Sequence, residues 1–507
     1  MSSALQRVRE LRPEVTPPTA QARQSARQRL LAVIEDEPPG LHAHRARRAR
    51  QPTPGGPVGP TRRIVPNLGR LGALVPAGVV AVAAAVVAGA LVLLGHHPSG
   101  TPVGSAGGHG RIEAAGGSVL IGPHAHAGLP AAIAEGLRRE YRTTLRAGKT
   151  IYTSIDLPLE RAAERSLRHS IAVNHGSGGA FVALDPSTGA VEAIGSATVG
   201  KARGGLDRAV SVAETTGGAF APITALAAMR AGVWSPQETY DDTGTFCLQS
   251  NPCYRNPGKA AYGVLTLSHA LAVDSSTFFD NLGARLNSSA ANGGALQSWA
   301  RRLGLGSTTG IDLPDETAGL LPTPKALREL HPPIRWSEAD NINLAVGQGD
   351  LAISPIQLAV AYAALSNGGT VLVPHLAPAG TTTAPPVRRH LPLPTSDLAA
   401  IRAGLRGSAA GLPGVAGTTQ RVFGSLPEPV GGAPGSTQTI SRGREVINGW
   451  YAGYVASSTH SRPLVVVVLV QHAGFGAVTA APVARQIFSQ WTAGHPGPFV
   501  PGTSVAQ

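Results

Sequence analysis

The chain has 507 residues, of which 14% are charged, 4% are aromatic and 42% are hydrophobic. This composition supports one sizeable folded core, although the length alone would allow two or three domains. The formal charge of +13 is unevenly spread, because residues 1–70 hold thirteen arginines against five acidic residues and so carry +8 of it. Nucleic-acid-binding domains are basic on their folded part, and this asymmetry therefore argues against nucleic acid as a partner.

The N-terminal region is predicted to be a basic cytoplasmic tail followed by a membrane anchor at 71–95. Residues 1–70 are rich in Pro, Arg and Gln and lack sustained apolar periodicity, and this composition indicates disorder. A short helical pattern at Ala26–Ile34 is the exception. Leu71–Leu94 contains no charged residue and is long enough to span a bilayer as a helix. Arginines flank only its N-terminal side, so the positive-inside rule places residues 96–507 outside the cytoplasm. The sequence thus predicts a single-pass protein of the plasma membrane.

A cleaved signal peptide and a buried core helix both fit the apolar segment less well. A signal peptide has a short charged region and an apolar core of about 7–15 residues, whereas 70 residues precede this longer segment. The arginine-rich tail before the segment argues against a buried core helix. The segment is therefore interpreted as a permanent anchor.

Beyond the anchor, residues 96–148 are predicted to be a linker with a short juxtamembrane segment. A folded domain is expected over 149–492, followed by a tail at 493–507. We interpret His96, His97, His124 and His126, which lie in Gly/Pro-rich stretches of the linker, as solvated side chains rather than metal ligands.

Apolar patterns from Lys149 onward predict strands at both ends of the domain and helices between them. The predicted strands are Ile151–Asp156, Gly179–Asp185, Ala190–Ile194, Gly449–Val455 and Pro463–Gln471. The predicted helices are Leu157–Ser170, Pro222–Ala231, Leu265–Leu286, Pro355–Leu365 and Pro482–Trp491. A Pro-Ser-Thr-Gly turn joins the second and third strands into a hairpin. This order indicates an α+β fold with an antiparallel sheet completed by the two ends of the domain.

The only two cysteines, Cys247 and Cys253, lie on the predicted outer side with five residues between them. In an oxidising compartment they could form a small-loop disulfide. A metal site needs more ligands than these two thiols, and nothing nearby supplies them. Neither a metal nor another cofactor is expected.

Several segments of the domain resemble the transpeptidase domain of penicillin-binding proteins, particularly class B enzymes of the rod-elongation type. The clearest stretch is Leu303–Leu365, where LGLGSTTGIDLPDETAGLLP is followed by NINLAVGQGDLAISPIQLAVAYAAL. The hairpin sequence FVALDPSTGAVEAI and the closing segment 448–487 also resemble the family, and the segments occur in the family's order. The resemblance implies a serine β-lactamase/transpeptidase-like fold and a role in peptidoglycan (cell wall) synthesis.

The resemblance also implies three catalytic motifs, S-x-x-K, S-x-N and K-T-G. A serine hydroxyl is a poor nucleophile until a nearby base takes its proton, and a lysine can act as that base once it is deprotonated. None of these motifs is intact in this sequence. The family-equivalent positions are Gly218 and Ala221 for S-x-x-K, Asp274 and Ser276 for S-x-N, and Ala433, Pro434 and Gly435 for K-T-G.

The third motif has an alternative register at Val415–Gly417, which also lacks the lysine. We prefer the first register because it leaves the family's usual short gap to Trp450. Proline at the threonine position additionally removes a backbone donor from the strand edge.

A displaced nucleophile could be Ser275, Ser276 or Ser436, each of which would lie near the cleft. A base is harder to find, because the four lysines of the chain lie outside the motifs and arginine cannot be deprotonated. We interpret these serines as ordinary loop and helix hydroxyls. The backbone N–H groups of Gly218 and Ser436 could still form an oxyanion hole.

These losses favour a pseudoenzyme that binds a partner or a wall stem peptide without covalent chemistry. The alternative is an active peptidoglycan D,D-transpeptidase that acylates through other residues. A β-lactam sensor fails for the same reason as the enzyme, because sensors of this fold depend on the acylated serine. The predicted partners are the membrane, through Leu71–Leu94, and a stem peptide or a membrane protein of wall synthesis. About 55 residues separate the anchor from Lys149, so contacts of the long class B pedestal cannot be transferred to this chain.

Overall fold

The computed structural model describes residues 110–121, 131–199, 207–249, 252–377, 386–441, 444–459 and 461–503. The predicted tail, its short helix and the predicted anchor at 71–94 lie outside these ranges. Within them, no helix is both long enough and apolar enough to cross a membrane.

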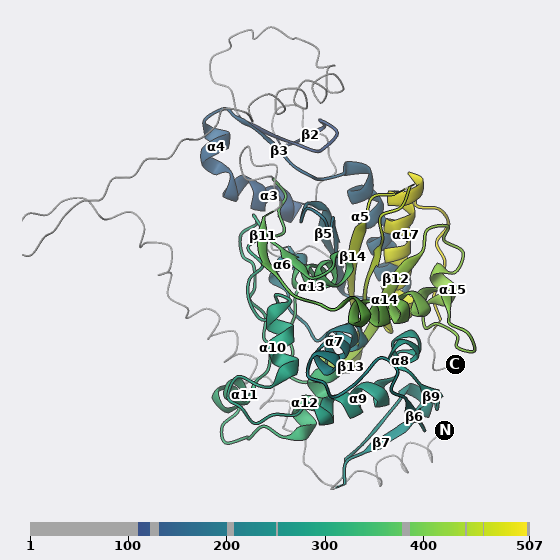
Figure 1. The fold of residues 1–507 in the computed structure, drawn as a ribbon. Coiled ribbons are helices and arrows are strands. Elements are labelled where there is room, and N and C mark those ends of the chain that lie inside the picture. The colour runs from purple at the N-terminus through teal and green to yellow at the C-terminus, as the bar shows by residue number, and fades with distance from the viewer. Residues whose placement is uncertain are drawn as a thin grey trace, which may run out of the picture. The chain divides into compact units, whose positions relative to one another are not determined.

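A five-stranded antiparallel sheet lies at the centre of the described fold (Figure 1). Its strands are β4 (Gly178–Leu184), β5 (Val191–Thr198), β12 (Val430–Ser441), β13 (Arg444–Val455) and β14 (Leu464–Gln471). The strand order is β12-β13-β14-β4-β5, so the two ends of the domain meet where β14 pairs with β4. This arrangement confirms the predicted α+β fold, the hairpin and the closure of the sheet by both ends of the domain.

Helices cover the sheet, and the described residues also form one small three-stranded sheet and three two-stranded sheets. The helices are α3 (Ala131–Glu140), α4 (Arg142–Arg146), α5 (Leu157–Val173), α6 (Arg208–Ser211), η1 (Gly217–Phe220), α7 (Ala221–Arg230), η2 (Pro257–Lys259), α8 (Leu267–Val273), α9 (Ser276–Arg285), α10 (Ala295–Arg302), α11 (Pro324–Leu330), α12 (Glu338–Ala345), α13 (Pro355–Asn367), α14 (Thr395–Ala410), α15 (Gln420–Phe423), α16 (Gly476–Thr479) and α17 (Ala481–Ala493). The small strands are β1 (Arg111–Glu113), β2 (Val119–Ile121), β3 (Thr150–Tyr152), β6 (Tyr240–Asp242), β7 (Thr245–Cys247), β8 (Cys253–Arg255), β9 (Gly263–Leu265), β10 (Thr370–Leu372) and β11 (Val387–His390).

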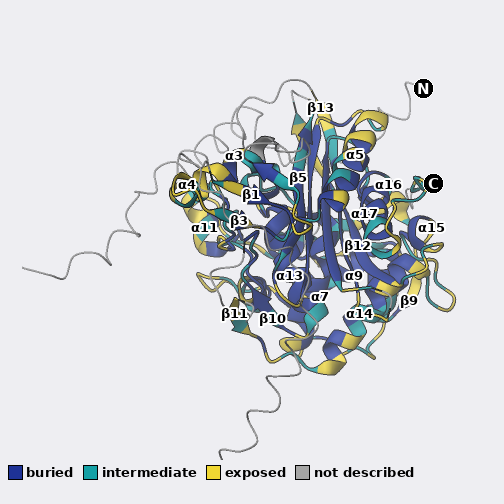
Figure 2. Cartoon of the chain, turned by 90° about the horizontal axis from the view of Figure 1, so that it is seen from above, coloured by how far each residue is buried: buried dark blue, intermediate teal, exposed yellow. Residues whose placement is uncertain are grey.

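The central strand β14 is buried on both faces, which explains its unbroken apolar sequence. Successive side chains of a strand point to opposite faces. Val465, Val467 and Leu469 accordingly join the core cluster that includes α13, whereas Val466 and Val468 join the cluster that includes α5 and α17. Figure 2 shows the sheet as a buried layer with the exposed residues on the surrounding helices and loops.

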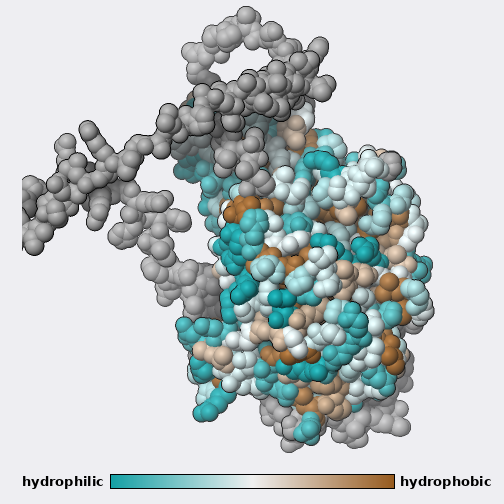
Figure 3. Space-filling view, in the orientation of Figure 1, coloured by the Kyte–Doolittle hydropathy of each residue, from teal (hydrophilic) through white to brown (hydrophobic). Residues whose placement is uncertain are grey.

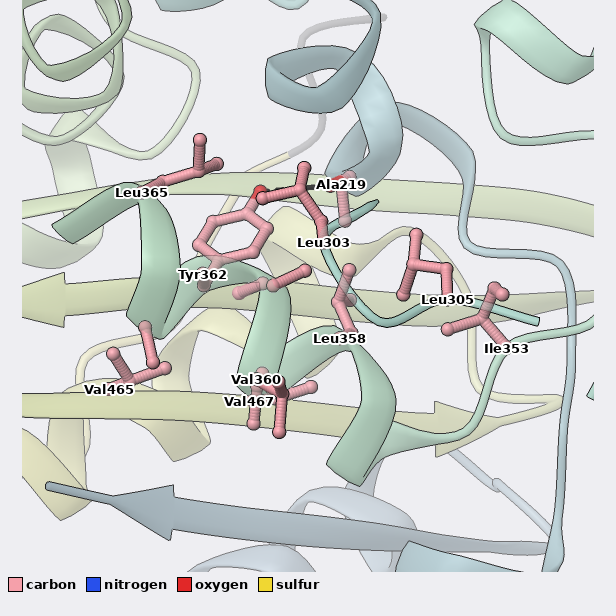
Figure 4. Close-up of a cluster of buried hydrophobic side chains, with 14 of the residues drawn as sticks. Ala219, Leu303, Leu305, Ile353, Leu358, Val360, Tyr362, Leu365, Val465 and Val467 are labelled. Atoms are coloured by element: carbon pink, nitrogen blue, oxygen red, sulfur yellow. Dashed lines mark hydrogen bonds between the residues drawn. The ribbon is translucent and has the colours of Figure 1, made fainter. Parts of the chain in front are cut away.

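Helix α13 connects the sheet to the segment that carries the predicted nucleophile position. Its apolar side chains pack with Val465 and Val467 of β14 (Figure 4). On the same helix, the buried Tyr362 hydroxyl donates a hydrogen bond to the carbonyl oxygen of Ala219 in η1 at 2.9 Å. This bond ties η1 to the core independently of any catalytic side chain.

The predicted single helix over Leu265–Leu286 is wrong, because the structure contains two helices, α8 and α9. Asp274 follows α8 in the left-handed region, with φ 57° and ψ 48°, which ends the helix. Ser275 then caps α9, since its side chain accepts a hydrogen bond from the N–H of Phe278. The break places Asp274 at a corner rather than within a helix.

The predicted linker and C-terminal tail are also more structured than expected. Residues 111–121 form β1 and β2, which join β3 in a small sheet, and Ile112 and Leu137 are fully buried. In the tail, the carbonyl oxygen of Pro498 accepts hydrogen bonds from Arg485 and Gln486 of α17. The described parts of both segments therefore contribute to the folded unit.

The start of α7 is held by a close approach between η1 and the turn after α12. The carbonyl oxygen of Gly347 accepts the backbone N–H groups of Thr216 and Gly217 at 3.0 and 2.9 Å. A Cβ at Gly347 would lie 2.2 Å from the carbonyl oxygen of Gly217, and φ is +69°. Only glycine satisfies both requirements here.

We expect Gly347→Ala to destabilise the fold by several kcal/mol, because it forces η1 and the turn apart. Gly232→Ala is the matched control, since its φ is +68° but no atom lies within 4 Å of an added Cβ. The control should cost only the left-handed backbone penalty of about 1–2 kcal/mol. Chemical unfolding of both variants measures the difference, and equal losses would contradict the steric explanation.

Candidate functional site

A pocket of about 430 Å³ lies where the first turn of α7, the α8–α9 corner and the edge strand β12 meet. This volume falls within the range of small-ligand pockets, which is about 300–1,000 Å³. The lining residues are Gly218, Ala221, Arg255, Pro257, Gly258, Tyr262, Val273, Asp274, Ser276, Phe279, Val346, Gln348, Thr418, Pro434, Ser436, Gln438, Ile447, Phe475 and Ala477.

The structure brings the three predicted motif regions together around this pocket. Gly218 and Ala221 line it from η1 and α7, Asp274 and Ser276 from the α8–α9 corner, and Pro434 from β12. Ala433 instead belongs to the buried core, and Gly435 does not line the pocket. The positions that sequence comparison equates with a catalytic centre are therefore neighbours in space.

The preferred register of the third motif agrees with the sheet topology. Residues 433–435 lie on β12, which is an edge strand and pairs only with β13. Val415–Gly417 lies instead in the segment between α14 and α15, and its neighbour Thr418 reaches the pocket.

Both proposed oxyanion-hole residues, Gly218 and Ser436, line the pocket, and η1 packs against β12 at this point. The Ser436 hydroxyl accepts a hydrogen bond from the N–H of Gly476 at 3.1 Å. The use of their N–H groups as an oxyanion hole stays a prediction.

Ser275, one of the proposed displaced nucleophiles, is part of a buried hydrogen-bond network. Its hydroxyl donates to Asp242 Oδ2 at 2.5 Å, and Asp242 also accepts two hydrogen bonds from the side-chain amide of Asn256. Ser275 has no exposed surface and does not line the pocket. Only Ser276 and Ser436 of the three serines remain accessible from it.

Asp274 is the acidic side chain of the pocket, and its carboxylate has no hydrogen-bond or ion-pair partner among the described residues. Burial raises its pKa to about 7, because removing a carboxylate from water disfavours its charged form. Burial also raises the pKa of Tyr262, to about 12, and the nearby charge of Asp274 adds to this shift. The carboxyl group is therefore poised to change charge near neutral pH.

The absence of a side chain at Gly218 and the presence of one at Asp274 are sterically linked. A Cβ built at position 218 would lie 2.2 Å from Oδ1 of Asp274 and 2.8 Å from its Cγ. The carboxylate therefore occupies the space into which a serine at 218 would project.

Among the described residues that line the pocket, Asp274 is the side chain that can accept a proton from a hydroxyl nucleophile. Among the described residues that line it, Arg255 and Asp274 carry the charges, and none is a lysine or a histidine. No hydroxyl hydrogen-bonds to Asp274 in the described part of the chain. A working serine–base pair needs such a contact, although it can be loose before substrate binds.

The predicted disulfide is present and supports one wall of the pocket. Cys247 and Cys253 are bonded across the β7–β8 hairpin, and β8 leads directly to Arg255, Pro257 and Gly258 in the pocket lining. Within the described ranges, no group of three or more His, Cys, Asp or Glu side chains could hold a metal ion.

Sequence analysis missed several polar lining residues, namely Arg255, Tyr262, Gln348 and Gln438. Gln348 lies in the Gly-Gln-Gly sequence that resembles the family, and Gln438 follows the degenerate K-T-G. The resemblance could therefore have identified both residues as part of the site. Arg255 and Tyr262 carry none, because only the tertiary fold brings β8 and the residues before β9 to the pocket.

A profile of the penicillin binding protein transpeptidase domain matches residues 179–489. The chain belongs to this family. The peptidoglycan D,D-transpeptidase MrdA of Haemophilus influenzae is 29% identical to it over 385 residues, which cover 68% of this chain and 56% of that protein. Similarity to MrdA proteins supports the class B, rod-elongation branch. The chain thus spans little more than half the length of this relative.

Two solved structures show the same transpeptidase fold. A chain from the study "Structural coordination of polymerization and crosslinking by a peptidoglycan synthase complex" is 28% identical, with a TM-score of 0.61, and the match covers 68% of this chain and 63% of that one. Pseudomonas aeruginosa PBP2 has a TM-score of 0.65 over 76% of this chain and 96% of its own, at 24% identity, which shows the fold alone.

We expect Gly218→Ala to destabilise the protein by about 1–3 kcal/mol, because the added methyl overpacks against Asp274. Alanine normally stabilises a helical position relative to glycine. In the Asp274→Gly background, which removes the carboxylate and tolerates the left-handed backbone, Gly218→Ala should therefore become neutral or stabilising. Unfolding of the four proteins in a double-mutant cycle measures this coupling.

Asp274→Asn is the control in this cycle, because it keeps the bulk of the side chain and removes its charge. Gly218→Ala should stay destabilising in that background. Loss of the penalty with asparagine would assign the coupling to charge and contradict a steric origin.

Asp274 should make the wild-type protein less stable as the pH rises. Its folded-state pKa of about 7 exceeds the unfolded value of about 3.9, so only the folded state holds the proton between them. The stability of wild type relative to Asp274→Asn should fall by up to about 1.4 kcal/mol per pH unit between about pH 4 and 7, then level off. Chemical unfolding of both proteins from pH 5 to 8 measures this, and parallel profiles would refute it.

Proposed function

We propose that this protein is a catalytically inactive member of its family, anchored in the membrane, that acts in peptidoglycan synthesis by non-covalent binding in the pocket. One observation carries this proposal: Gly218 supplies no nucleophile, and the carboxylate of Asp274 fills the adjacent space. Family membership supports the wall-synthesis role.

The chemistry of acyl transfer explains why the loss of these groups indicates an inactive protein. Acylation needs a nucleophilic atom and a base that removes its proton. Gly218 and Ala221 provide neither group. Ala433, at the lysine position of K-T-G, has no charged side chain and lies in the core. A carboxylate next to position 218 would also repel the oxyanion that develops when a carbonyl is attacked there.

Membrane anchoring is proposed from the sequence of Leu71–Leu94, its length and its flanking arginines. On this basis the N-terminal tail is cytoplasmic and the C-terminal domain lies outside the cytoplasm. The Cys247–Cys253 disulfide supports an oxidising, extracytoplasmic environment.

The proposed ligand is a wall stem peptide, and the proposed partner is a membrane protein of wall synthesis. Similarity to a chain from a peptidoglycan synthase complex supports such a partner. The size of the pocket and its polar lining support a peptide ligand.

An active peptidoglycan D,D-transpeptidase is the alternative, and the name of the MrdA relatives favours it. Activity would require Ser276 or Ser436 as the nucleophile, because these are the serines that line the pocket. Asp274 would then have to act as the base, since its pKa of about 7 permits proton transfer near neutral pH.

Labelling with a fluorescent penicillin distinguishes the two functions. We expect the full-length protein in detergent to give no covalent band after denaturing electrophoresis, because no acyl-enzyme can form. MrdA of Haemophilus influenzae, labelled in parallel, is the positive control. A band that survives denaturation would overturn the inactive assignment, and its loss in Ser276→Ala or Ser436→Ala would identify the nucleophile.

A further inference from the structure

On the face shown in Figure 3, hydrophobic residues form small separate patches rather than one broad area. A second group, the buried carboxyls of Glu160 and Asp207, lies between α5, β5 and α6, away from the pocket lining. The unexplained feature with access to a ligand is Asp274.

Three properties of Asp274 point to a missing positively charged group. It lines a pocket of ligand size, it carries a carboxylate without a partner among the described residues, and its left-handed backbone fixes it at the α8–α9 corner. Buried polar groups nearly always have a hydrogen-bond partner. Asp274 is half-buried and its carboxyl group meets the pocket, so a ligand that binds there can supply the partner that the described residues do not.

We propose that the pocket binds a peptide through a primary ammonium group that forms an ion pair with Asp274. This inference rests on the proposed function, because it assigns a ligand group to the same pocket. The ammonium is compact and donates up to three hydrogen bonds, which suits a carboxylate packed close against the backbone of Gly218.

The remaining lining residues accommodate the rest of such a peptide. Arg255 is exposed on the pocket wall and makes no ion pair within the described residues, so it can bind a carboxylate of the same ligand. Gln348 and Gln438 provide both donors and acceptors for peptide groups. The ligand class is thus a zwitterionic peptide with a side-chain amine.

Removing the ligand's charge tests the ion pair directly. The probe is the pentapeptide Nα-acetyl-L-Ala-γ-D-Glu-L-Lys-D-Ala-D-Ala, in which the lysine carries the one ammonium group, and its comparison is the same peptide with an Nε-acetylated lysine. Acetylation removes the positive charge and leaves the backbone unchanged. Calorimetric titration of the full-length protein in detergent at pH 8, where Asp274 is ionised, should show binding of the lysyl peptide and about tenfold to hundredfold weaker binding of the acetylated one.

Variants of the protein locate the effect at Asp274. Asp274→Asn should weaken the lysyl peptide to the level of the acetylated peptide and abolish the difference between them. Asp241→Asn is the matched control, because Asp241 is an exposed acid on nearby β6 that does not line the pocket. It should bind both peptides as wild type does.

The outcomes separate this inference from the proposed function. Equal binding of both peptides by wild type, or unchanged selectivity in Asp274→Asn, would overturn the ion pair while leaving non-covalent peptide binding intact. Binding of neither peptide would overturn the ammonium site and the peptide ligand together. Penicillin labelling judges catalytic inactivity independently of all these results.

Discussion

The pocket depends on a backbone contact rather than on catalytic side chains. Two N–H groups of the segment at Thr216 and Gly217 donate to the carbonyl oxygen of Gly347, and the hydroxyl of Tyr362 on α13 donates to the carbonyl oxygen of Ala219. These bonds hold η1, and with it the start of α7, against the turn after α12 and against α13. Because they involve main-chain atoms at η1, they persist whatever side chains occupy positions 218 and 221.

This constraint explains how the family's architecture can remain when its motifs are lost. The nucleophile and base positions can change to Gly218 and Ala221 without loosening the segment that carries them. Space released at position 218 is then taken by Asp274 from the neighbouring corner. The result is a pocket with the family's location but with an acidic group in place of a reactive hydroxyl.

Sequence patterns predicted the sheet well because its strands carry strong local signals. The apolar run of β14 and the hairpin of β4 and β5 have lengths and turns typical of strands, and both were confirmed. The short strands β1 and β2 escaped prediction, since three residues show no periodicity and their pairing is set by packing. Length alone was not sufficient, because the long strand β12 (Val430–Ser441) and the long helix α14 (Thr395–Ala410) were not predicted either.

The site was predictable in part, and its missed features have a common cause. Alignment to the family placed Gly218, Asp274 and Pro434 around one pocket, which the structure supports. The break at Asp274 was missed because the surrounding apolar spacing continues through it, although Asp followed by Ser is a recognisable end and start of helices. The clash between Asp274 and a side chain at 218 could not be predicted, because the two positions are far apart in the sequence and meet only in the fold.

The energetic cost of Asp274 also indicates that the pocket binds a ligand. A carboxylate that is withdrawn from water without a partner lowers stability once it ionises, and its pKa of about 7 means that this occurs near physiological pH. Small uncharged side chains, such as Ala221 nearby, would line the pocket without this cost. Groups that oppose stability are concentrated at functional sites, where a ligand or reaction compensates them. The cost at Asp274 is therefore most simply explained by a cationic group that pairs with it in the bound state.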